Sequence, residues 1–422
     1  VPFPKKEDRD AVSPSRWEAA RILIRVERGD KVSDLLDATR KTLIPVDESL
    51  LRELVYGCTR QKRLLDHYLS GLCQSPFVRL PQEVKVTLRL GLYQLLFLTR
   101  VPAHAAVYES VNLIKQSEQE KSSGFVNAVL RTAETKKNEF TIVGEDELDT
   151  LALKYSHPTW LVKRWAQTMT PSALEDILKA NNTPHPVYLH NKPGLQEKVV
   201  EDLKKEQAVL EPVGWPADTL RLRSHEGGLF TGESFHSGDW LVQDWTPQAM
   251  LGLLPLTGGE KVWDVCAAPG GKTVALAWRV GEKGQVIASD ISSERRKKLS
   301  QNIKRTGLKN VMVFDGEMAK LPSSQKFDLI WVDAPCSGTG VLSRRADLRW
   351  RLILKDILSS VDRQKELMDE AADHVYPKGK LVYSTCSMEK EENGDIVLDF
   401  LNRHPDFRLD TPDGVEGHSE IV

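Results

Sequence analysis

Apolar positions in the first third of the chain recur every three or four residues. They include Leu51, Leu54, Val55 and Cys58, and further along Leu88, Leu92, Leu95 and Leu96. This spacing places apolar side chains on one face of a helix, whereas the alternation typical of strands is absent. We therefore predict that residues 1–144 form an all-α helical bundle.

The middle of the chain has a mixed pattern. Helical stretches such as Trp160–Trp165 and Leu174–Leu178 are followed by Pro186–His190, which has the pattern of a strand. Glycine and proline then become frequent and the apolar pieces become short. We predict a small α+β connecting domain over residues 145–232.

From residue 233 onward, short apolar runs alternate with helical stretches. The runs that we expect to be buried strands are Lys261–Val265, Val286–Ser289, Val311–Phe314, Leu329–Val332 and Lys380–Tyr383. A helical stretch, Glu294–Arg305, lies between the second and third runs and is closed by Gly307. Alternating buried strands and helices predict a doubly wound parallel sheet, a Rossmann-like α/β domain, over residues 233–422.

Composition places the chain among soluble globular proteins. Of its 422 residues, 28% are charged and 40% are hydrophobic, and we find neither a membrane-length apolar run nor a charged-then-apolar leader. The net charge of -2 conceals an asymmetry, because residues 1–140 hold 23 Lys+Arg against 18 Asp+Glu and the remainder holds 35 against 42. A basic amino-terminal part is a modest indication that this part binds a polyanion.

The cysteines argue against a disulfide framework. The five cysteines, at positions 58, 73, 266, 336 and 386, lack dense regular spacing, and no CxxC pair indicates zinc. We expect reduced thiols in a cytoplasmic protein and no bound metal.

Two of the cysteines follow predicted strands directly. Cys336 lies in Asp333–Gly340, and Cys386 lies in Ser384–Ser387. In an open parallel sheet, ligands bind beyond the carboxyl ends of the strands. Two thiols at that edge, one of them near the carboxylate of Asp333, point to covalent chemistry on an electron-poor ring rather than to packing.

A glycine-rich segment, Asp264–Thr273, follows the first strand of the α/β domain and opens a helix. Its glycines allow close approach of a ligand, and the helix start offers free N–H groups. The dinucleotide fingerprint G-x-G-x-x-G is not met. The phosphate loop G-x-x-x-x-G-K-[ST] fails only because Cys266 replaces its first glycine, so this segment alone leaves phosphate binding open.

Aspartates stand at the ends of the first four predicted strands of this domain. They are Asp264, Asp290, Asp315 and Asp333. A single aspartate at such a place often caps a turn. Four in series suit a cationic, adenosine-bearing cofactor better than a triphosphate, with Asp290 placed to accept the hydroxyls of a ribose.

These motifs carry a family resemblance. The segments Asp264–Thr273, Asp333–Gly340 and Ser384–Ser387, together with Asp290, resemble those of the RNA cytosine-C5 methyltransferases, which use S-adenosyl-L-methionine. The first third resembles the antitermination factor NusB in Leu51–Gly57, Leu88–Gln94, Pro102–Ala105 and Gly124–Arg131. The whole chain resembles the RsmB (Sun/Fmu) family, bacterial 16S rRNA cytosine-C5 methyltransferases with a NusB-like amino-terminal domain.

The resemblance implies roles for particular residues. Cys386 is expected to be the nucleophile, Cys336 to help release the product, and Asp333 to contact the target ring. The cofactor is expected to contact Cys266, Ala267, Ala268, Pro269, Gly270, Gly271, Lys272, Asp290, Asp315 and Asp333. The expected partner is RNA, either 16S rRNA or a small-subunit assembly intermediate, and the protein is expected to be a monomer that does not bind membranes.

The chain departs from the family pattern at its carboxyl end. An apolar last strand is expected after Asp413-Gly414 and is not recognisable there, so we expect the final edge hairpin to be missing or altered.

The implied chemistry is physically reasonable for these residue types. Cytosine C5 is a poor nucleophile, and addition of a thiolate at C6 gives the ring enamine character at C5. The target base must leave its stack to enter such a site. Because DNA cytosine-C5 methyltransferases use the Pro-Cys residue as nucleophile, Cys336 competes with Cys386 for that role.

Two other functions remain possible on the sequence alone. One is an RNA-binding ribosome-assembly or antitermination factor with an inactive methyltransferase domain, and the other is a nucleotidase. Beyond the main motifs, we expect Arg344, Arg345, Arg349 and Arg351 to form, around Trp350, a platform for phosphates and bases. We also expect Glu389 and Asn393 to shape the Cys386 loop or cap the following helix.

Overall fold

The computed structural model describes residues 12–39, 43–225, 229–230, 232–315, 321–322 and 324–410. They form two compact units, each assembled from two stretches of chain. Unit 1 comprises the residues up to Pro184 together with Val341–Leu352, and unit 2 comprises His185–Gly340 and the residues from Ile353 onward. The domain boundaries predicted after residues 144 and 232 stay a prediction.

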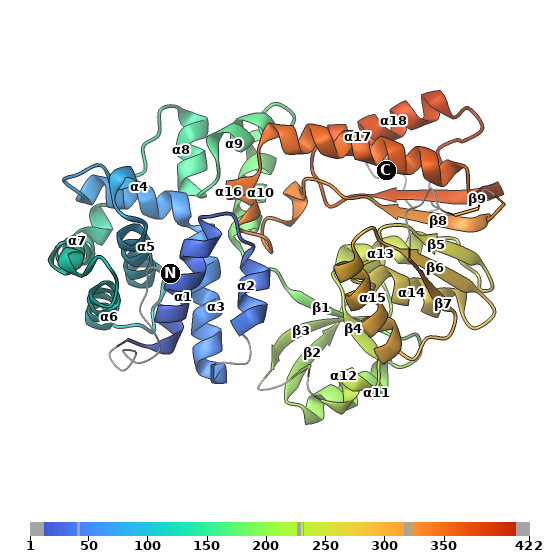
Figure 1. Cartoon of the computed structure of the whole chain (residues 1–422), viewed down its shortest axis with the longest axis horizontal. Coiled ribbons are helices and arrows are strands. Elements are labelled where there is room, and N and C mark those ends of the chain that lie inside the picture. Colours follow the sequence, from blue (N-terminus) through green and yellow to red (C-terminus); the bar gives the residue numbers. More distant parts are fainter. Residues whose placement is uncertain are drawn as a thin grey trace. The chain divides into compact units, whose positions relative to one another are not determined.

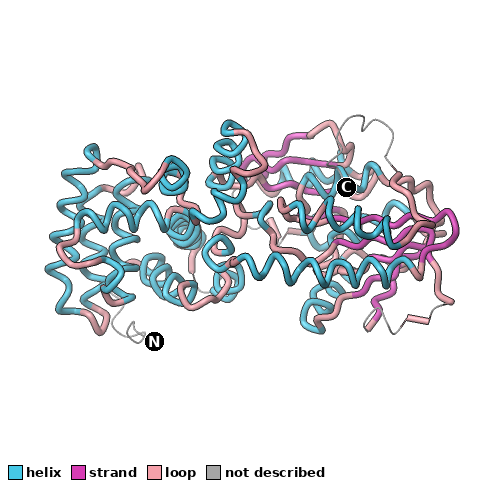
Figure 2. Tube along the Cα trace, turned by 90° about the horizontal axis from the view of Figure 1, so that it is seen from above, coloured by secondary structure: helices cyan, strands magenta, loops and turns pink. Residues whose placement is uncertain are grey.

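Among the described residues, unit 1 consists of helices and connecting loops, as Figures 1 and 2 show. This confirms the all-α prediction for the first third of the chain. Its α-helices are α1 (Pro14–Val26), α2 (Val32–Thr39), α3 (Pro45–Arg60), α4 (Lys62–Leu72), α5 (Gln82–Phe97), α6 (Ala103–Lys115), α7 (Ser123–Lys136), α8 (Glu147–Lys154), α9 (Thr159–Trp165), α10 (Pro171–Asn182) and α16 (Leu348–Arg351).

Local sequence explains where several of these helices begin. Proline occupies the first turn of α1, α3 and α10, where its missing N–H costs no hydrogen bond. Asp146 caps α8 by accepting the Asp149 N–H, and Thr170 caps α10 by accepting the Ala173 N–H. The predicted apolar face is confirmed, since Leu51, Leu54 and Val55 are all buried in the core of unit 1.

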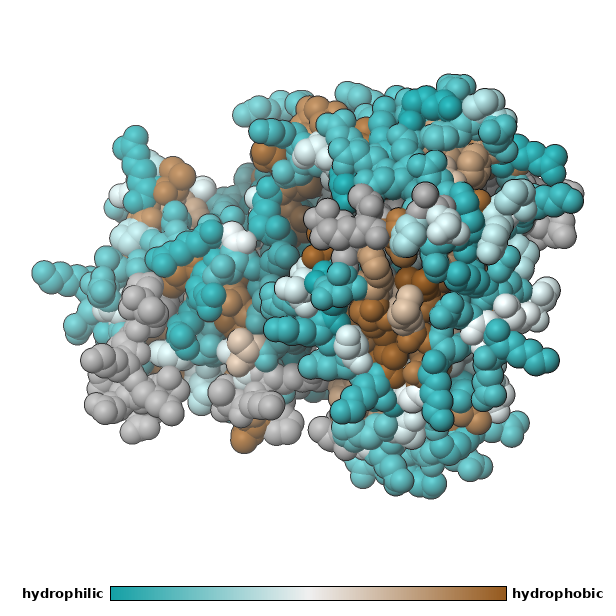
Figure 3. Space-filling view, turned by 45° about the vertical axis from the view of Figure 1, so that its right-hand side comes forward, coloured by the Kyte–Doolittle hydropathy of each residue, from teal (hydrophilic) through white to brown (hydrophobic). Residues whose placement is uncertain are grey.

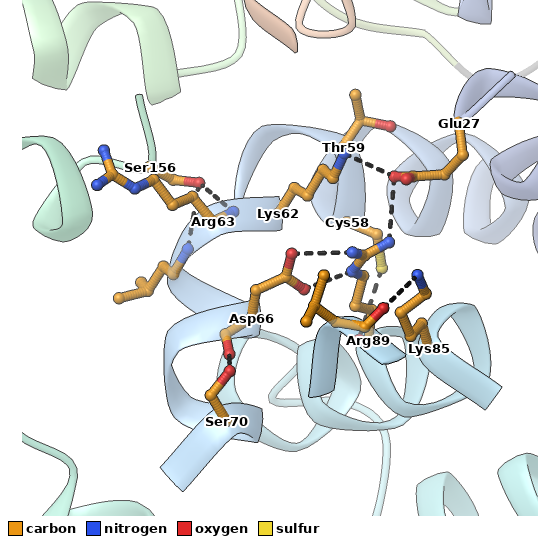
Figure 4. Close-up of polar contacts among 12 residues, drawn as sticks. Glu27, Cys58, Thr59, Lys62, Arg63, Asp66, Ser70, Lys85, Arg89 and Ser156 are labelled. Carbon is orange, nitrogen blue, oxygen red and sulfur yellow. Dashed lines mark hydrogen bonds and ion pairs between the residues drawn. The ribbon is translucent and has the colours of Figure 1, made fainter. Parts of the chain in front are cut away.

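Charged side chains in unit 1 are tied to one another by internal ion pairs (Figure 4). Arg89 of α5 donates two hydrogen bonds to Asp66, at 2.5 and 2.8 Å, and a third to Glu27 at 3.1 Å. Glu27 also pairs with Lys62 at 2.9 Å. The surrounding carboxylates raise the pKa of Arg89 despite its burial. These charges therefore stabilise the helical core, and their pairing within the unit leaves them poorly placed to bind a ligand.

The segment 341–352 is part of unit 1 although it follows the predicted Cys336 loop in the sequence. The Trp350 indole N–H donates to the Thr59 carbonyl at 2.7 Å, and Arg60 donates to the Ser343 carbonyl at 3.3 Å. Arg349 is completely buried. Its Nη1 donates to the Ser156 carbonyl and to Asn182 Oδ1, and its Nη2 donates to the carbonyls of Asn181 and Leu342, at 2.9–3.4 Å.

Unit 2 begins with a small antiparallel sheet, which confirms the predicted α+β connecting region. Its strand order is β2-β3-β1-β4. The strands are β1 (Val187–Asn191), β2 (Ala208–Pro212), β3 (Thr219–His225) and β4 (Trp240–Val242), with helices α11 (Gln196–Lys205) and α12 (Glu233–His236). Buried side chains of the sheet and of α11, including Leu189, Leu203 and Trp240, form its core.

The rest of unit 2 is a doubly wound parallel sheet, as predicted. The strand order is β7-β6-β5-β8-β9, and every neighbouring pair is parallel. The strands are β5 (Lys261–Asp264), β6 (Gln285–Ser289), β7 (Val311–Phe314), β8 (Phe327–Asp333) and β9 (Val375–Ser384). The helices are α13 (Trp245–Leu253), α14 (Gly271–Val280), α15 (Ser293–Arg305), α17 (Leu354–Ala372) and α18 (Gly394–Arg403).

Helices cover both faces of the parallel sheet (Figure 1). Alternate residues of one strand point to opposite faces. Trp263 and Ile330 pack in the cluster that contains Met368 of α17 and Phe400 of α18. Their neighbours Val262 and Leu329 pack on the other face, in the cluster that contains α14 residues such as Leu276. Burial on both faces explains the continuous apolar runs in the sequence.

The face of the molecule seen in Figure 3 is mostly hydrophilic. None of the helices that the structure describes is long and apolar enough to span a bilayer. The expectation about a last strand after Asp413-Gly414 lies outside the described residues.

Candidate active site

The glycine-rich segment turns from the end of β5 into α14. Gly270 precedes the helix with φ of 106°, in the left-handed region that favours glycine. A Cβ atom at this position would lie 2.8 Å from Cδ1 of Leu299. A side chain at this position is therefore excluded twice, by the backbone conformation and by packing against α15.

Asp264 is completely buried at the end of β5. Its Oδ2 accepts a hydrogen bond from the Thr273 hydroxyl at 2.6 Å, whereas Oδ1 has no hydrogen-bond partner among the described residues. Burial raises the pKa of Asp264 to about 7. Burial likewise raises the pKa of Cys266 to about 12, so this cysteine remains a thiol at neutral pH.

Asp290 follows β6 and has only 3% of its surface exposed. Its carboxylate accepts hydrogen bonds from the N–H groups of Ala268 and Ser292, at 3.3 and 3.0 Å, and pairs with Arg295 at 3.3 Å. Asp290 therefore orders the glycine-rich loop. Asp315, after β7, is largely exposed and forms an ion pair with Arg296.

Asp333 ends β8, the strand next to β5. Lys272 at the start of α14 donates to Oδ2 of Asp333 at 2.5 Å, and the Ser384 hydroxyl donates to Oδ1 at 2.8 Å. The Trp331 indole N–H holds the same serine hydroxyl at 2.9 Å. Strand order reverses between β5 and β8, which is where doubly wound sheets bind ligands.

The two cysteines singled out by the sequence meet at this edge. Their sulfur atoms lie 3.3 Å apart, although the residues are fifty positions apart in the chain. The Cys386 backbone N–H also donates to Cys336 Sγ at 3.3 Å. Cys386 is exposed and Cys336 only partly so. The hydrogen bond with Cys386, followed by burial, raises the pKa of Cys336 well above its usual range, so Cys336 holds its proton at neutral pH.

A buried carboxylate that the sequence analysis missed lies beneath both cysteine loops. Glu392 is completely buried and accepts hydrogen bonds from Ser337 and Ser387, the residues after the two cysteines. Asn393 accepts from the Thr385 hydroxyl at 2.6 Å, and its amide donates to the Ser387 carbonyl at 3.0 Å, so its expected role in shaping this loop is confirmed. The available signal was a run of acidic residues, Glu391-Glu392, directly after the loop.

The predicted arginine platform does not exist as such. The prediction is wrong for Arg349, whose guanidinium is buried in unit 1. Trp350 and Arg351 make hydrogen bonds within unit 1. The Trp350 indole N–H donates to the Thr59 carbonyl, and the Arg351 guanidinium donates to the Asp347 carboxylate at 2.9 Å. Of the predicted arginines, only Arg344 and Arg345 are exposed.

The residues of this edge fit an adenosine-bearing cation. Gly270 packs against Leu299 with no room for a Cβ atom, which keeps the turn tight. The carboxylates of Asp290, Asp315 and Asp333 lie at this edge, and each is paired with one cation, Arg295, Arg296 and Lys272 respectively. A triphosphate fits poorly, because the lysine that would bind it, Lys272, is held by Asp333.

Family models match three stretches of the chain. Residues 13–135 match the NusB family, residues 157–226 match the ferredoxin-like domain of RsmF/B-like methyltransferases, and residues 251–420 match the 16S rRNA methyltransferase RsmB/F family.

Curated relatives match over most of their length. The ribosomal RNA small subunit methyltransferase B of Citrobacter koseri is 33% identical, over 91% of this chain and 89% of the relative. That of Salmonella paratyphi B is 34% identical, over 92% and 90%, and the probable one of Synechocystis is 32% identical, over 93% and 90%.

Solved structures agree with these matches. The crystal structure of PH0851 aligns with a TM-score of 0.77 and 26% identity, over 95% of this chain and 93% of that one. A methyltransferase homologue from Pyrococcus horikoshii aligns with a TM-score of 0.54 and 26% identity, over 61% and 83%. The nucleotidase alternative is therefore set aside. Both the motif resemblance and the fold prediction are confirmed, and the chain belongs to the RsmB/F family of S-adenosylmethionine-dependent methyltransferases.

Proposed function

We propose that the protein methylates C5 of a cytosine in RNA, most specifically 16S rRNA, through a covalent adduct between Cys386 and C6 of the ring. The observation that carries this proposal is the pair of thiols 3.3 Å apart beside Asp333. Methylation of a ring nitrogen or a hydroxyl requires no thiol, whereas C5 of cytosine becomes nucleophilic only after a nucleophile adds at C6. The names of the curated relatives support ribosomal RNA of the small subunit as the substrate.

The geometry supports Cys386 as the nucleophile. Its side chain is exposed, so an incoming base can reach it, whereas Cys336 is partly buried. Because Cys336 keeps its proton, its S–H can donate to the Cys386 sulfur and stabilise negative charge there. While Cys336 holds this proton it cannot accept the C5 proton itself, so we assign it to the departure step: its S–H donates to Cys386 Sγ as that sulfur leaves C6, and a separate base takes the C5 proton.

We assign Asp333, with Lys272 beside it, to orienting the ring of the target cytosine. Asp333 is the last residue of β8 to pair with β9, and its carboxylate accepts hydrogen bonds from both Lys272 and Ser384. With the ammonium of Lys272 beside it, the carboxyl can contact N3 and the exocyclic amine while electron density moves toward them. Fixing Asp333 on both sides reduces the reorganisation needed during the reaction.

The glycine-rich loop is proposed to hold the cofactor. S-adenosylmethionine, when bound, supplies an electrophilic methyl group. We assign its binding to Cys266–Lys272, Asp290, Asp315 and Asp333, with the carboxylates favouring its cationic sulfonium and its ribose hydroxyls. Since Asp290 already holds Ala268 and Ser292, it orders the loop and can still accept hydrogen bonds on its remaining lone pairs.

RNA binding is proposed to involve exposed cations of unit 1. Two cations of the basic stretch Arg60–Arg63 form ion pairs within unit 1, because Arg63 pairs with Asp149 and Lys62 pairs with Glu27. Exposed Arg100 and Lys121 remain available for phosphates. Changing both to glutamine should lower RNA affinity and reduce its dependence on salt, by a slope of up to about 0.9 per lost phosphate contact.

The decisive experiment is to map 5-methylcytosine in ribosomal RNA. Bisulfite sequencing of rRNA from cells lacking this protein should show the loss of one methylated cytosine in 16S rRNA. Expression of the unaltered protein should restore it, and the Cys386→Ala variant should not. An unchanged map would contradict the proposed substrate and leave the alternative of an RNA-binding assembly factor. The expected site of action is the cytoplasm, where unpaired thiols persist.

A further inference from the structure

The loops that carry Cys336 and Cys386 come from different strands, β8 and β9. Several hydrogen bonds tie the loops together directly, including Gly340 N to the Cys386 carbonyl at 2.9 Å and Met388 N to the Thr339 hydroxyl at 2.9 Å. Beneath both loops, just before α18, lies the side chain of Glu392, with no exposed surface.

The Glu392 carboxylate accepts hydrogen bonds from both loops at once. Its Oε1 accepts from the Ser337 backbone N–H at 2.8 Å and from the Gln364 amide at 3.2 Å. Its Oε2 accepts from the hydroxyls of Ser337 and Ser387, the second at 2.5 Å. The Glu392 carbonyl also accepts from the Tyr383 hydroxyl at 2.6 Å, which ties the same residue to the end of β9.

These bonds use the whole accepting capacity of the carboxylate. A carboxylate offers about four lone-pair sites, and Glu392 receives four donors. Leaving buried donors without an acceptor is unfavourable, because each donor has given up its hydrogen bonds to water without a replacement. Losing the carboxylate would therefore favour movement of the loops until the serines and the Ser337 N–H find other partners.

We propose that Glu392 is a positioning residue that holds the Cys336 and Cys386 loops together so that the two thiols stay within reacting distance. The inference rests on the proposed function for the reactive role of the thiols, and it adds a cause for their arrangement. Glu392 touches neither sulfur in the described structure through a hydrogen bond. It acts through Ser337 and Ser387, the residues next to the two cysteines.

The charge of Glu392 adds a second effect on the same pair. After the hydrogen bond with Cys386 and burial, the Glu392 carboxylate is among the groups that raise the pKa of Cys336. A negative charge beneath the loop thus helps to keep Cys336 protonated.

Two substitutions separate position from charge. Glu392→Gln keeps the size and one accepting oxygen, and the serine hydroxyls can rotate to accept from the new amide, so the loops should stay together without the charge. Glu392→Ala removes both the hydrogen-bond acceptors and the negative charge. The matched control is Asp395→Asn, which removes a carboxylate from the exposed side of the same region. Should Glu392→Ala fail to fold, the double variant Ser337→Ala with Ser387→Ala removes the two hydroxyls and keeps Glu392.

The primary measurement needs no RNA. Diamide oxidises two neighbouring thiols to a disulfide, taking up their two protons and two electrons, and peptide mass spectrometry identifies the 336–386 link. Because closely held groups react at high effective concentration, link formation should slow by about tenfold or more in Glu392→Ala and by less than about threefold in Glu392→Gln. The Asp395→Asn control should match the wild type, and the double serine variant should be slowed in the same direction as Glu392→Ala.

Single-turnover methyl transfer and cofactor affinity complete the test. Methyl transfer should fall in parallel with link formation, with the S-adenosylmethionine dissociation constant within about twofold of the wild type. In Glu392→Gln, alkylation of Cys336 by iodoacetamide should begin at lower pH. Unchanged link formation in folded Glu392→Ala would overturn the proposal. Slower link formation in a protein whose wild type methylates no cytosine would instead support the positioning role and refute the proposed function.

Discussion

Two completely buried ionisable side chains, Arg349 of unit 1 and Asp264 of unit 2, are accommodated in different ways. Arg349 donates through both terminal nitrogens to four oxygens, only its Nε lacking a partner among the described residues. Two of these oxygens belong to Asn181 and Asn182, at the end of α10, where the helix dipole favours a cation. Asp264 receives one hydrogen bond, from Thr273, and its other oxygen has none from the described protein.

The two buried charges differ in role, because Arg349 stabilises the fold whereas Asp264 lies at the proposed active site. In unit 1, the Arg349 guanidinium is held by four oxygen acceptors, none of them a carboxylate, and burial lowers its pKa to about 9. These four hydrogen bonds join the ends of two helices to the segment 341–352. In unit 2, the incompletely matched Asp264 lies at the strand edge that also carries Asp333 and the exposed thiol of Cys386. Functional sites tolerate such incomplete matching because it serves binding and reaction rather than stability. Substitutions of buried charges in unit 1 should therefore lower stability more than activity. Substitutions at the strand edge should lower activity more than stability.

The largest expected effect is on activity without loss of stability. Cys386→Ala should abolish methyl transfer and covalent adduct formation, because C5 is never activated. Cys336→Ala should permit attack and transfer but stall release, so protein and RNA should migrate together on a denaturing gel. Thermal unfolding of both variants should stay close to the wild type. A stable adduct with Cys386→Ala instead would reverse the two roles.

A large effect on stability is expected in unit 1. Arg349→Ala would leave the carbonyls of Ser156, Asn181 and Leu342 without their donor. At roughly 1–3 kcal/mol for each such group, the free energy of unfolding should fall by about 4 kcal/mol or more. The exposed Arg345→Ala should change it by less than about 0.5 kcal/mol. Equal stability of the two variants in urea denaturation would show that Arg349 is not a structural cation.

Asp264 gives a prediction for pH dependence. Its pKa rises from 3.8 when unfolded to about 7 when folded, so folding takes up a proton between these values. Wild-type stability should therefore be greatest, relative to Asp264→Asn, below about pH 4 and should decline as the pH rises to about 7. The change across this window should be at most on the order of 4 kcal/mol. A pH-independent difference between the two proteins would mean that Asp264 stays ionised in the folded state.

The smallest predicted effect concerns cofactor affinity. Asp290→Ala should raise the S-adenosylmethionine dissociation constant by about tenfold or more, since a hydrogen bond to a charged group contributes roughly 1.5–3 kcal/mol. The exposed neighbour Glu294→Ala serves as the control in isothermal calorimetry. If Asp290→Ala is folded and binds normally, Asp290 only orders the loop through Ala268 and Ser292.

The sequence determined the architecture and the location of the chemistry. Buried parallel strands need continuous apolar runs, so β5 to β9 could be placed from Lys261–Val265 and its counterparts to within a few residues. Because the carboxyl ends of parallel strands meet at one edge, the residues after those runs were expected to converge, and Asp264, Asp333 and the two cysteines do so.

Tertiary packing decided what each charged residue does. A local pattern cannot show whether Arg349 faces water or the ends of α8 and α10, because those helices lie more than 150 positions earlier in the chain. It likewise cannot show that Glu392 accepts from Ser337, 55 residues away. Helices and strands follow from periodicities within a few residues, whereas the partners of a buried charge come from whatever distant segments the fold brings against it.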